Sequence, residues 1–177
     1  SITYSFVVDS MDQAILIMKY AILFEDPGHA DKQNLFNLEV LDPNDRVIDP
    51  TCGVVNFEFK DASEWNLAEE VSFNGSRKIA KLYWKDWTSI GLNLKHYHGK
   101  TLKVRVTVAD CGQSGHASWA YFVMDCVSAK LETDNCGNAS TISVNAPEGF
   151  DYTWTNSKDS ILGHDRTLDA EAGREVY

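Results

Sequence analysis

Apolar and polar residues alternate along several short stretches of the chain. Between residues 102 and 109, Leu102, Val104, Val106 and Val108 alternate with polar or small side chains. A period of two residues is typical of a strand with one buried face. Residues 119–124 are apolar at every position, which indicates a central strand of a packed sandwich.

The same reading predicts eight strands, and helical periodicity is nearly absent. Turn-forming residues separate the strands, as in Asp42-Pro-Asn and Asn74-Gly75. The acidic stretch 61–70 is expected to be a surface loop. Many short strands with such breaks predict an all-β fold, an antiparallel β-sandwich of jelly-roll type. The predicted strands are 2–8, 14–24, 35–41, 54–60, 79–84, 90–94, 102–109 and 119–127.

Near residue 133 the composition shifts to small polar residues, which indicates a linker. The prediction is a sandwich over 1–131, a linker over 132–140 and a partial Ig-like or PKD-like β segment over 141–177. Trp154 is the expected core tryptophan of that last segment. Such a sandwich needs roughly 100 residues, so we expect the segment to be truncated and the chain to be a piece of a longer protein.

Composition narrows the classes of partner. The net charge of −10 over 177 residues argues against nucleic acid, because phosphate binding needs a basic surface. It also argues against anionic membranes, and no run of about 18 apolar residues predicts a membrane span. An acidic surface suits a secreted or cell-surface protein, and we expect this module to be a monomer.

The four cysteines show no C-x2-C zinc spacing. Disulfides in an oxidising compartment are the favoured interpretation, and four buried thiols in a cytosolic protein are the alternative. If residues 47–48 climb back along the sandwich after the turn at 42–45, Cys52 reaches the end where Cys111 closes its strand. We therefore predict a Cys52–Cys111 disulfide, and by elimination a Cys126–Cys136 pair.

The run from Asp110 to His116 holds an acid, a thiol, two glycines and a histidine between two predicted strands. It is the first candidate for a bound ion or ligand. Its Gly115 and His116, together with His29 of an earlier loop, are predicted ligand-binding residues. Two histidines near acids also permit Zn²⁺, although a hydrogen-bonding role for His116 is favoured.

Four carboxylates lie at the ends of predicted strands, where loops converge. Together they would supply the oxygen ligands that Ca²⁺ prefers, and the alternative is that they cap turns. The predicted metal-ligating set is Glu25, Asp26, Asp110 and Asp125.

Aromatic residues offer a sugar-binding interpretation. Trp65 stands among acidic residues and is predicted to be exposed, whereas Trp84 and Trp119 lie in strand patterns and are expected in the core. No nucleophile has an adjacent base: Gly112-Gln-Ser-Gly-His116 lacks the last glycine of a G-x-S-x-G elbow. The chain is therefore predicted not to be an enzyme.

Three motifs in this order carry a family resemblance: Glu25-Asp-Pro-Gly-His29, Trp84-Lys-Asp-Trp87, and the series Asp110-Cys, Gly115-His, Ala120-Tyr and Asp125. Residues 1 to about 130 resemble jelly-roll modules of Bacteroidetes surface proteins. Such modules precede Ig-like or PKD-like repeats in adhesin-like proteins, and calcium sites are common in related modules.

The resemblance implies a non-catalytic extracellular module for adhesion or ligand binding. Its expected partner is a cell-surface protein or a glycan. The alternative is a carbohydrate-binding module attached to a polysaccharide-processing enzyme.

Overall fold

The computed structural model describes residues 1–8, 14–29, 33–68, 71–72, 79–112, 115–127, 130–134 and 140–171. Within these residues, two short 3-10 turns, η2 (Ala62–Glu64) and η3 (Lys95–Tyr97), are the only helical elements, and the other elements are strands. The strands are β1 (Ile2–Val7), β2 (Ile15–Glu25), β3 (Leu35–Leu41), β4 (Val54–Glu58), β5 (Asn66–Leu67), β6 (Val71–Ser72), β7 (Ile79–Ala80), β8 (Leu82–Asn93), β9 (Thr101–Ala109), β10 (Ser118–Val127), β11 (Glu132–Asp134), β12 (Thr141–Asn145), β13 (Trp154–Thr155), β14 (Ile161–Gly163) and β15 (Thr167–Glu171).

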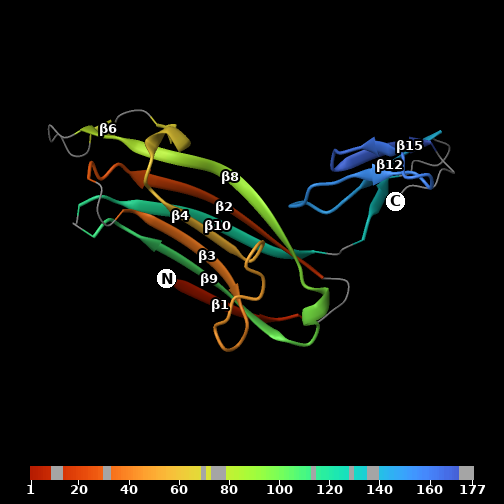
Figure 1. The fold of residues 1–177 in the computed structure, drawn as a ribbon, viewed down its shortest axis with the longest axis horizontal. Helices are drawn as coiled ribbons and strands as arrows, with labels where there is room; N and C mark the ends of the chain where they lie inside the picture. Colours follow the sequence, from red (N-terminus) through yellow and green to blue (C-terminus); the bar gives the residue numbers. More distant parts are fainter. Residues whose placement is uncertain are drawn as a thin grey trace.

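Two four-stranded antiparallel sheets form the larger part of the molecule, as Figure 1 shows. One has the strand order β1-β9-β3-β4 and the other β10-β2-β8-β5. The chain crosses between the two sheets after β1, β2, β4, β8 and β9, so strands that follow one another in sequence often lie in opposite sheets. The predicted antiparallel β-sandwich is thus confirmed at this level.

The core lies between the two sheets. Phe36, Leu38 and Val40 of β3 are fully buried, and they meet inward side chains of β2 such as Met18 and Phe24. The alternation read from the sequence is what places these side chains on one face of each strand. Full burial of one such side chain stabilises the fold by about 1.5–3 kcal/mol.

The segment expected to form two strands, 79–84 and 90–94, instead forms the long strand β8. Tyr20 pairs with Thr88 and Ile22 pairs with Lys85, so β8 carries one extra residue opposite Ala21. This is the signature of a β-bulge. The polar residues that suggested a break are accommodated by the bulge, and the strand continues past them.

Residues 130–171 add a second, smaller unit. The sheet β11-β12-β15 and the hairpin β13–β14 enclose Val144, Ala146 and Trp154. Trp154 is 3% exposed and its indole Nε1 donates to the Asp165 carbonyl oxygen at 2.7 Å, so it is the core tryptophan that we predicted. Strand β11 lies inside the predicted linker and belongs to this sheet.

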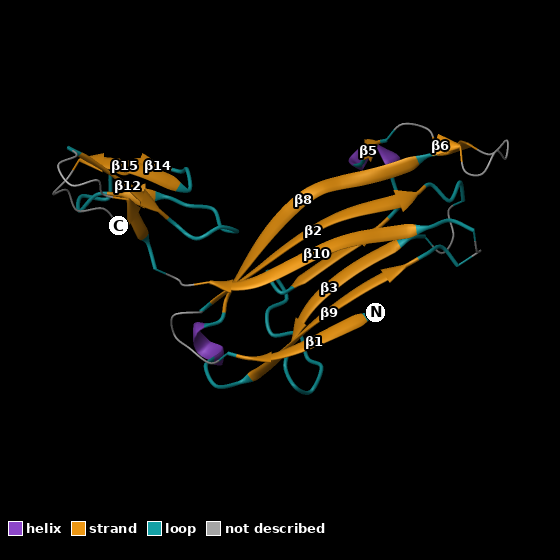
Figure 2. Cartoon of the chain, turned by 180° about the vertical axis from the view of Figure 1, so that it is seen from behind, coloured by secondary structure: helices purple, strands orange, loops and turns teal. Residues whose placement is uncertain are grey.

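The smaller unit lies beyond one end of the sandwich (Figure 2), and it contacts β2 and β8 through residues 148–150. A Cβ atom on Gly91 of β8 would lie 2.5 Å from the Phe150 ring, so the absence of a side chain there admits the ring. Gly149, with a φ of +92°, lies against the Gly91 backbone, and Lys19 of β2 pairs with Glu148. Among the described residues, no helix is long and apolar enough to span a membrane.

Candidate functional site

The loops after β2 and β9 meet at the end of the sandwich away from the smaller unit. The Glu25 backbone N–H donates to the Ala117 carbonyl oxygen, and the Ala117 N–H donates to Glu25 Oε2, both at 3.0 Å. Asn34, which is fully buried, donates from Nδ2 to the carbonyl oxygens of Glu25 and Ala117 at 3.0 and 3.3 Å. These bonds hold the two loops together.

The two loops bring His29, Cys111 and His116 together. Their ligand atoms all lie within 4.8 Å of one another. Cys111 Sγ is 3.1 Å from His116 Nδ1, and the rings of His29 and His116 have centroids 5.6 Å apart. His29 and His116 were predicted to share a site, and the structure places them side by side.

Each histidine follows a glycine that has a positive φ: Gly28 at +63° and Gly115 at +109°. Other residues rarely adopt this conformation. The glycines therefore let each loop turn sharply just before its histidine. The predicted site residue Gly115 contributes through its backbone in this way.

Cys111 has a different role from the predicted one. Cys52 is an exposed free cysteine and Cys111 is a buried one, so the predicted disulfide between them is wrong. The physical reason is the path of the chain after β3. The bridge between Leu41 and Val47 is local, and the chain climbs back only along β4, where Val54 pairs with Glu39 and Glu58 with Leu35.

Cys52 therefore stays at the Val40 end of β3, where the Gly53 carbonyl oxygen accepts from the Val40 N–H. Cys111 follows Ala109, which pairs with Leu35 at the other end. Five residues of strand separate the two ends, about 17 Å, far beyond the roughly 7 Å Cα limit of a disulfide. Cys136 lies outside the described residues, so its predicted pairing with Cys126 is not addressed.

The four carboxylates predicted to bind calcium do not lie together. Asp125 of β10 pairs with Ile17 of β2, eight residues along the strand from Glu25, or about 26 Å. Asp26 Oδ1 accepts from the Gly28 N–H at 2.8 Å, so Asp26 caps a turn, whereas Glu25 Oε2 accepts from the Ala117 N–H of the other loop. Asp110 is exposed beyond β9. A shared site that includes Asp125 is therefore wrong, and calcium binding by the others stays a prediction.

Trp65, predicted to be the exposed sugar-binding tryptophan, is 8% exposed. Its ring centroid lies 5.0 Å from that of Phe24 and 5.6 Å from that of Phe59. Asp61 caps η2 by accepting from the Ser63 N–H, and this turn directs the chain so that Trp65 enters the core. Trp65 is a core residue and not part of a binding site.

Other aromatic side chains are exposed on the outer face of β10, β2 and β8. Trp119 is 39%, Tyr121 63% and Trp87 53% exposed. Leu23 of β2 pairs with Trp119 of β10 on one side and with Trp84 of β8 on the other. Tyr121 of β10 pairs with Ala21 of β2. We call Trp84, Trp87, Trp119 and Tyr121 the aromatic face.

Ala21 of β2 lies between Tyr121 on β10 and Trp87 on β8, and its small side chain leaves room for both rings. The ring centroids of Tyr121 and Trp87 are 6.4 Å apart, and the ring planes are inclined by 54°. The bulge in β8 turns Trp87 toward this side, because the extra residue changes which side chains point outward. Trp119 was predicted to lie in the core. Its exposed fraction of 39% shows that this prediction is wrong.

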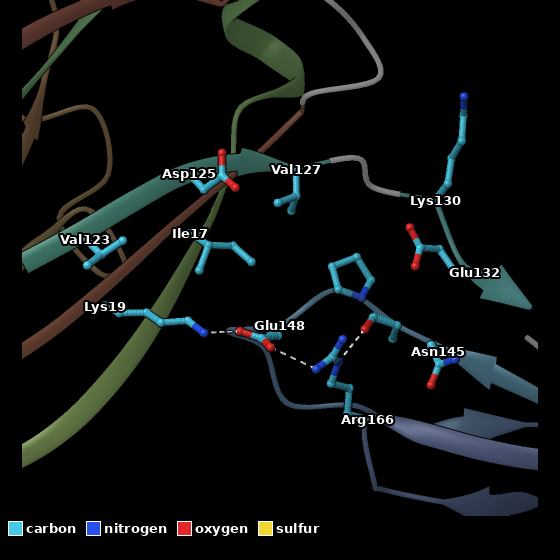
Figure 3. A pocket seen from close by; sticks show the side chains of 12 residues that line it. Ile17, Lys19, Val123, Asp125, Val127, Lys130, Glu132, Asn145, Glu148 and Arg166 are labelled. Atoms are coloured by element: carbon cyan, nitrogen blue, oxygen red, sulfur yellow. Dashed lines mark hydrogen bonds and ion pairs between the residues drawn. The ribbon is translucent and has the colours of Figure 1, made fainter.

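A cavity of about 410 Å³ lies between the sandwich and the smaller unit (Figure 3). Glu148 stands at its centre, paired with Lys19 and with Arg166 Nη1 at 2.9 Å. The hydrogen bond and charge of Lys19, with a smaller contribution from Arg166, hold the pKa of Glu148 below its usual value. Asp125 lines this cavity. The cavity lies at the end of the sandwich opposite to Glu25, so Asp125 is far from the other predicted calcium ligands.

The chain matches no protein-family model, no curated protein and no solved structure. The resemblance to Bacteroidetes jelly-roll modules therefore stays a prediction. In the part of the chain that the structure describes, the candidate sites are the histidine–cysteine cluster and the aromatic face.

Proposed function

We propose that this chain is a non-catalytic binding module of a larger secreted or cell-surface bacterial protein, and that its ligand binds across the aromatic face. One observation carries the proposal: Trp87 of β8 and Trp119 and Tyr121 of β10 are exposed together on the same outer face, on either side of β2. Exposed apolar patches of this kind mark binding sites, and Trp and Tyr are enriched among residues that dominate binding energy.

The supporting strands favour binding because they hold the rings in place before the ligand arrives. β2 pairs with both neighbours along most of its length, and ordered side chains lose little entropy on association. The finer assignment of a jelly roll belongs to the same proposal. It is supported by the repeated crossing of the chain between the two sheets.

The aromatic face also favours the second candidate, a carbohydrate-binding module attached to a polysaccharide-processing enzyme. Aromatic rings present apolar surface on which the C–H faces of sugar rings stack. The three strands span about 10 Å, so the face is broad enough for more than one contact. An adhesin with a protein partner would use the same side chains as anchors.

A non-catalytic role is supported by the position of the one thiol–imidazole contact in the described residues. A thiol beside an imidazole is also the arrangement of a cysteine nucleophile and its base. Cys111 is only 5% exposed, which leaves a substrate little access to the sulfur. We therefore propose binding, and not covalent chemistry, at this end.

Glycan-array and cell-binding measurements test the proposal. Replacing Trp87, Trp119 and Tyr121 together by Ala is expected to weaken binding at least about 10-fold, the usual effect of losing anchor residues. Tyr4→Ala is the matched control, since Tyr4 is 55% exposed but lies on β1 of the other sheet.

Loss of glycan binding in the triple variant would favour the carbohydrate candidate. Loss of binding to a cell-surface protein would favour adhesion. A triple variant that binds like the wild type would contradict the proposal, as would turnover of a polysaccharide or peptide by the purified chain.

A further inference from the structure

The cluster of His29, Cys111 and His116 supplies three donor atoms that face one another. Cys111 is 5% exposed, and all three ligand atoms lie within 4.8 Å. Thiolate sulfur and imidazole nitrogen are the donors that transition-metal ions prefer, whereas Ca²⁺ and Mg²⁺ prefer oxygen.

His29 provides a second, independent observation. Both of its ring nitrogens are enclosed, and neither has a hydrogen-bond partner within the part of the chain that the structure describes. Buried polar groups in native proteins are almost always paired. One of its nitrogens lies within 4.8 Å of the ligand atoms of Cys111 and His116, where a bound ion would supply the missing partner.

We propose that His29, Cys111 and His116 bind a transition-metal ion such as Zn²⁺ or Cu²⁺ through one sulfur and two nitrogens. This site is separate from the aromatic face and does not depend on the proposed function. Tetrahedral coordination at usual bond lengths places ligand atoms about 3.3–3.6 Å apart. The observed 3.1 Å between Cys111 Sγ and His116 Nδ1 lies just below this range. The 4.8 Å upper limit exceeds it by about 1.2–1.5 Å, which an inward movement of a side chain would close.

The backbone is built to hold these ligands. The bonds between Glu25 and Ala117, and the amide of Asn34, fix the two loops beside the cluster. The glycine before each histidine sets its direction. These bonds position the loops and do not reach the ligand side chains themselves.

The proposed site lies beside an open depression and leaves a free coordination position. His29 lines an open depression of about 590 Å³ together with Asp26, Gln33 and Glu58. Three protein ligands leave a fourth position of a tetrahedral ion for water or another small ligand. The ion would join loops that follow β2 and β9, so it would link the two sheets at this end.

The test uses the chain stripped of metal and then titrated with Zn²⁺, Cu²⁺, Co²⁺ or Ca²⁺ in a calorimeter. We expect one transition-metal ion per chain, and a rise of roughly 5–10 °C in melting temperature at 100 times the dissociation constant. Bound Co²⁺ is expected to show a thiolate charge-transfer absorption. Zn²⁺ is also expected to protect Cys111, but not exposed Cys52, from alkylation.

Three variants test the ligands: His29→Ala, Cys111→Ser and His116→Ala. Each is expected to weaken metal binding more than about 100-fold, because loss of a direct ligand should exceed the roughly 10–100-fold loss that is typical for a residue that only supports a ligand. His96→Ala and Cys52→Ser are the controls, because both residues lie outside the cluster. Circular dichroism shows whether each variant keeps its β structure. His29→Ala removes a half-buried side chain, so it tests the site even if Cys111→Ser fails to fold.

Binding of Zn²⁺ or Cu²⁺ that the three variants lose and the controls keep would establish the site. The relative affinities for Zn²⁺ and Cu²⁺ would then show which of the two ions the site prefers. Binding that survives all three substitutions, a response to Ca²⁺ alone, or no transition-metal binding at all would overturn the proposal. None of these results depends on ligand binding at the aromatic face.

Discussion

Asn34 shows how one side chain fixes the site end of the sandwich. Within the described ranges it is the single fully buried polar residue. Its amide nitrogen bonds the carbonyl oxygens of Glu25 and Ala117, and these residues lie in the two loops that carry His29 and His116. The Asn34 amide nitrogen therefore satisfies two carbonyl oxygens, whereas its own Oδ1 is buried without a hydrogen-bond partner in the described residues.

Replacing Asn34 by Ala is expected to lower the free energy of unfolding by about 1–3 kcal/mol, because the Glu25 carbonyl oxygen loses its side-chain donor and the Ala117 carbonyl oxygen keeps only the Glu25 N–H. Asn37→Ala is the matched control: Asn37 is half-buried and makes one long bond, 3.4 Å, to the Val55 carbonyl oxygen. Urea unfolding measures both variants. Equal losses in the two would contradict a special role for Asn34.

Single residues were also where sequence interpretation failed most. Trp65 has acidic neighbours, which indicate solvent, yet a capped 3-10 turn brings it into the core. Trp119 lies in an apolar run, which indicates burial, yet alternate residues of that run face outward. Local composition cannot distinguish these cases, because burial depends on which sheet face another element covers.

At the scale of elements, the sequence was sufficient for most strands. Residues 35–41 were predicted with the bounds that β3 has, because apolar alternation and turn residues at the end agree. β8 was divided in two because a bulge interrupts its period of two residues. A one-residue insertion changes the face of every following side chain, so a bulge is indistinguishable from a break without the partner strand.

The turn after β3 leads to a prediction about the stability of the protein at low pH. Asp42 Oδ1 accepts from the backbone N–H groups of Arg46 and Asn44, and the bond from Arg46 is the largest cause of a lowered pKa for Asp42. A carboxyl group whose pKa falls on folding adds stability above its unfolded pKa. It loses that stability as the pH falls through the folded pKa.

Asp42→Asn removes this charge and keeps a side-chain oxygen that can accept hydrogen bonds. We therefore expect the wild type to exceed Asp42→Asn in free energy of unfolding near pH 6, and the difference to shrink near pH 3. Urea unfolding at the two pH values measures it. A difference that is the same at both would show that the charge of Asp42 does not contribute.

At the scale of the whole molecule, the outer face of the sheet β10-β2-β8-β5 takes part in two different surfaces. Its far end, at Ile17, Gly91 and Asp125, meets the smaller unit, and its remaining part carries the aromatic face. The chain itself covers only part of this sheet. The predicted boundary near residue 131 gave no indication of this contact, because Gly91 and Phe150 are 59 positions apart and no local pattern connects them.

The contact between the two units depends on the missing side chain at Gly91. A methyl group there would lie 2.5 Å from the Phe150 ring and 3.0 Å from the Gly149 carbonyl oxygen, so Gly91→Ala is expected to displace Phe150. Overpacking of this kind costs about 1–3 kcal/mol. We expect a larger radius of gyration by small-angle X-ray scattering and faster proteolysis between residues 127 and 140.

Gly163→Ala is the matched control, because its added methyl group would meet Leu168 at an ordinary 3.6 Å. Phe150→Ala removes the same contact from the other side, and it is expected to reproduce the scattering change without a clash. If Gly91→Ala scatters like the wild type while Phe150→Ala does not, the sheet relaxes around the methyl group. If neither changes the scattering, the packing of Phe150 on Gly91 does not hold the two units together, and the ion pair between Lys19 and Glu148 becomes the contact to test.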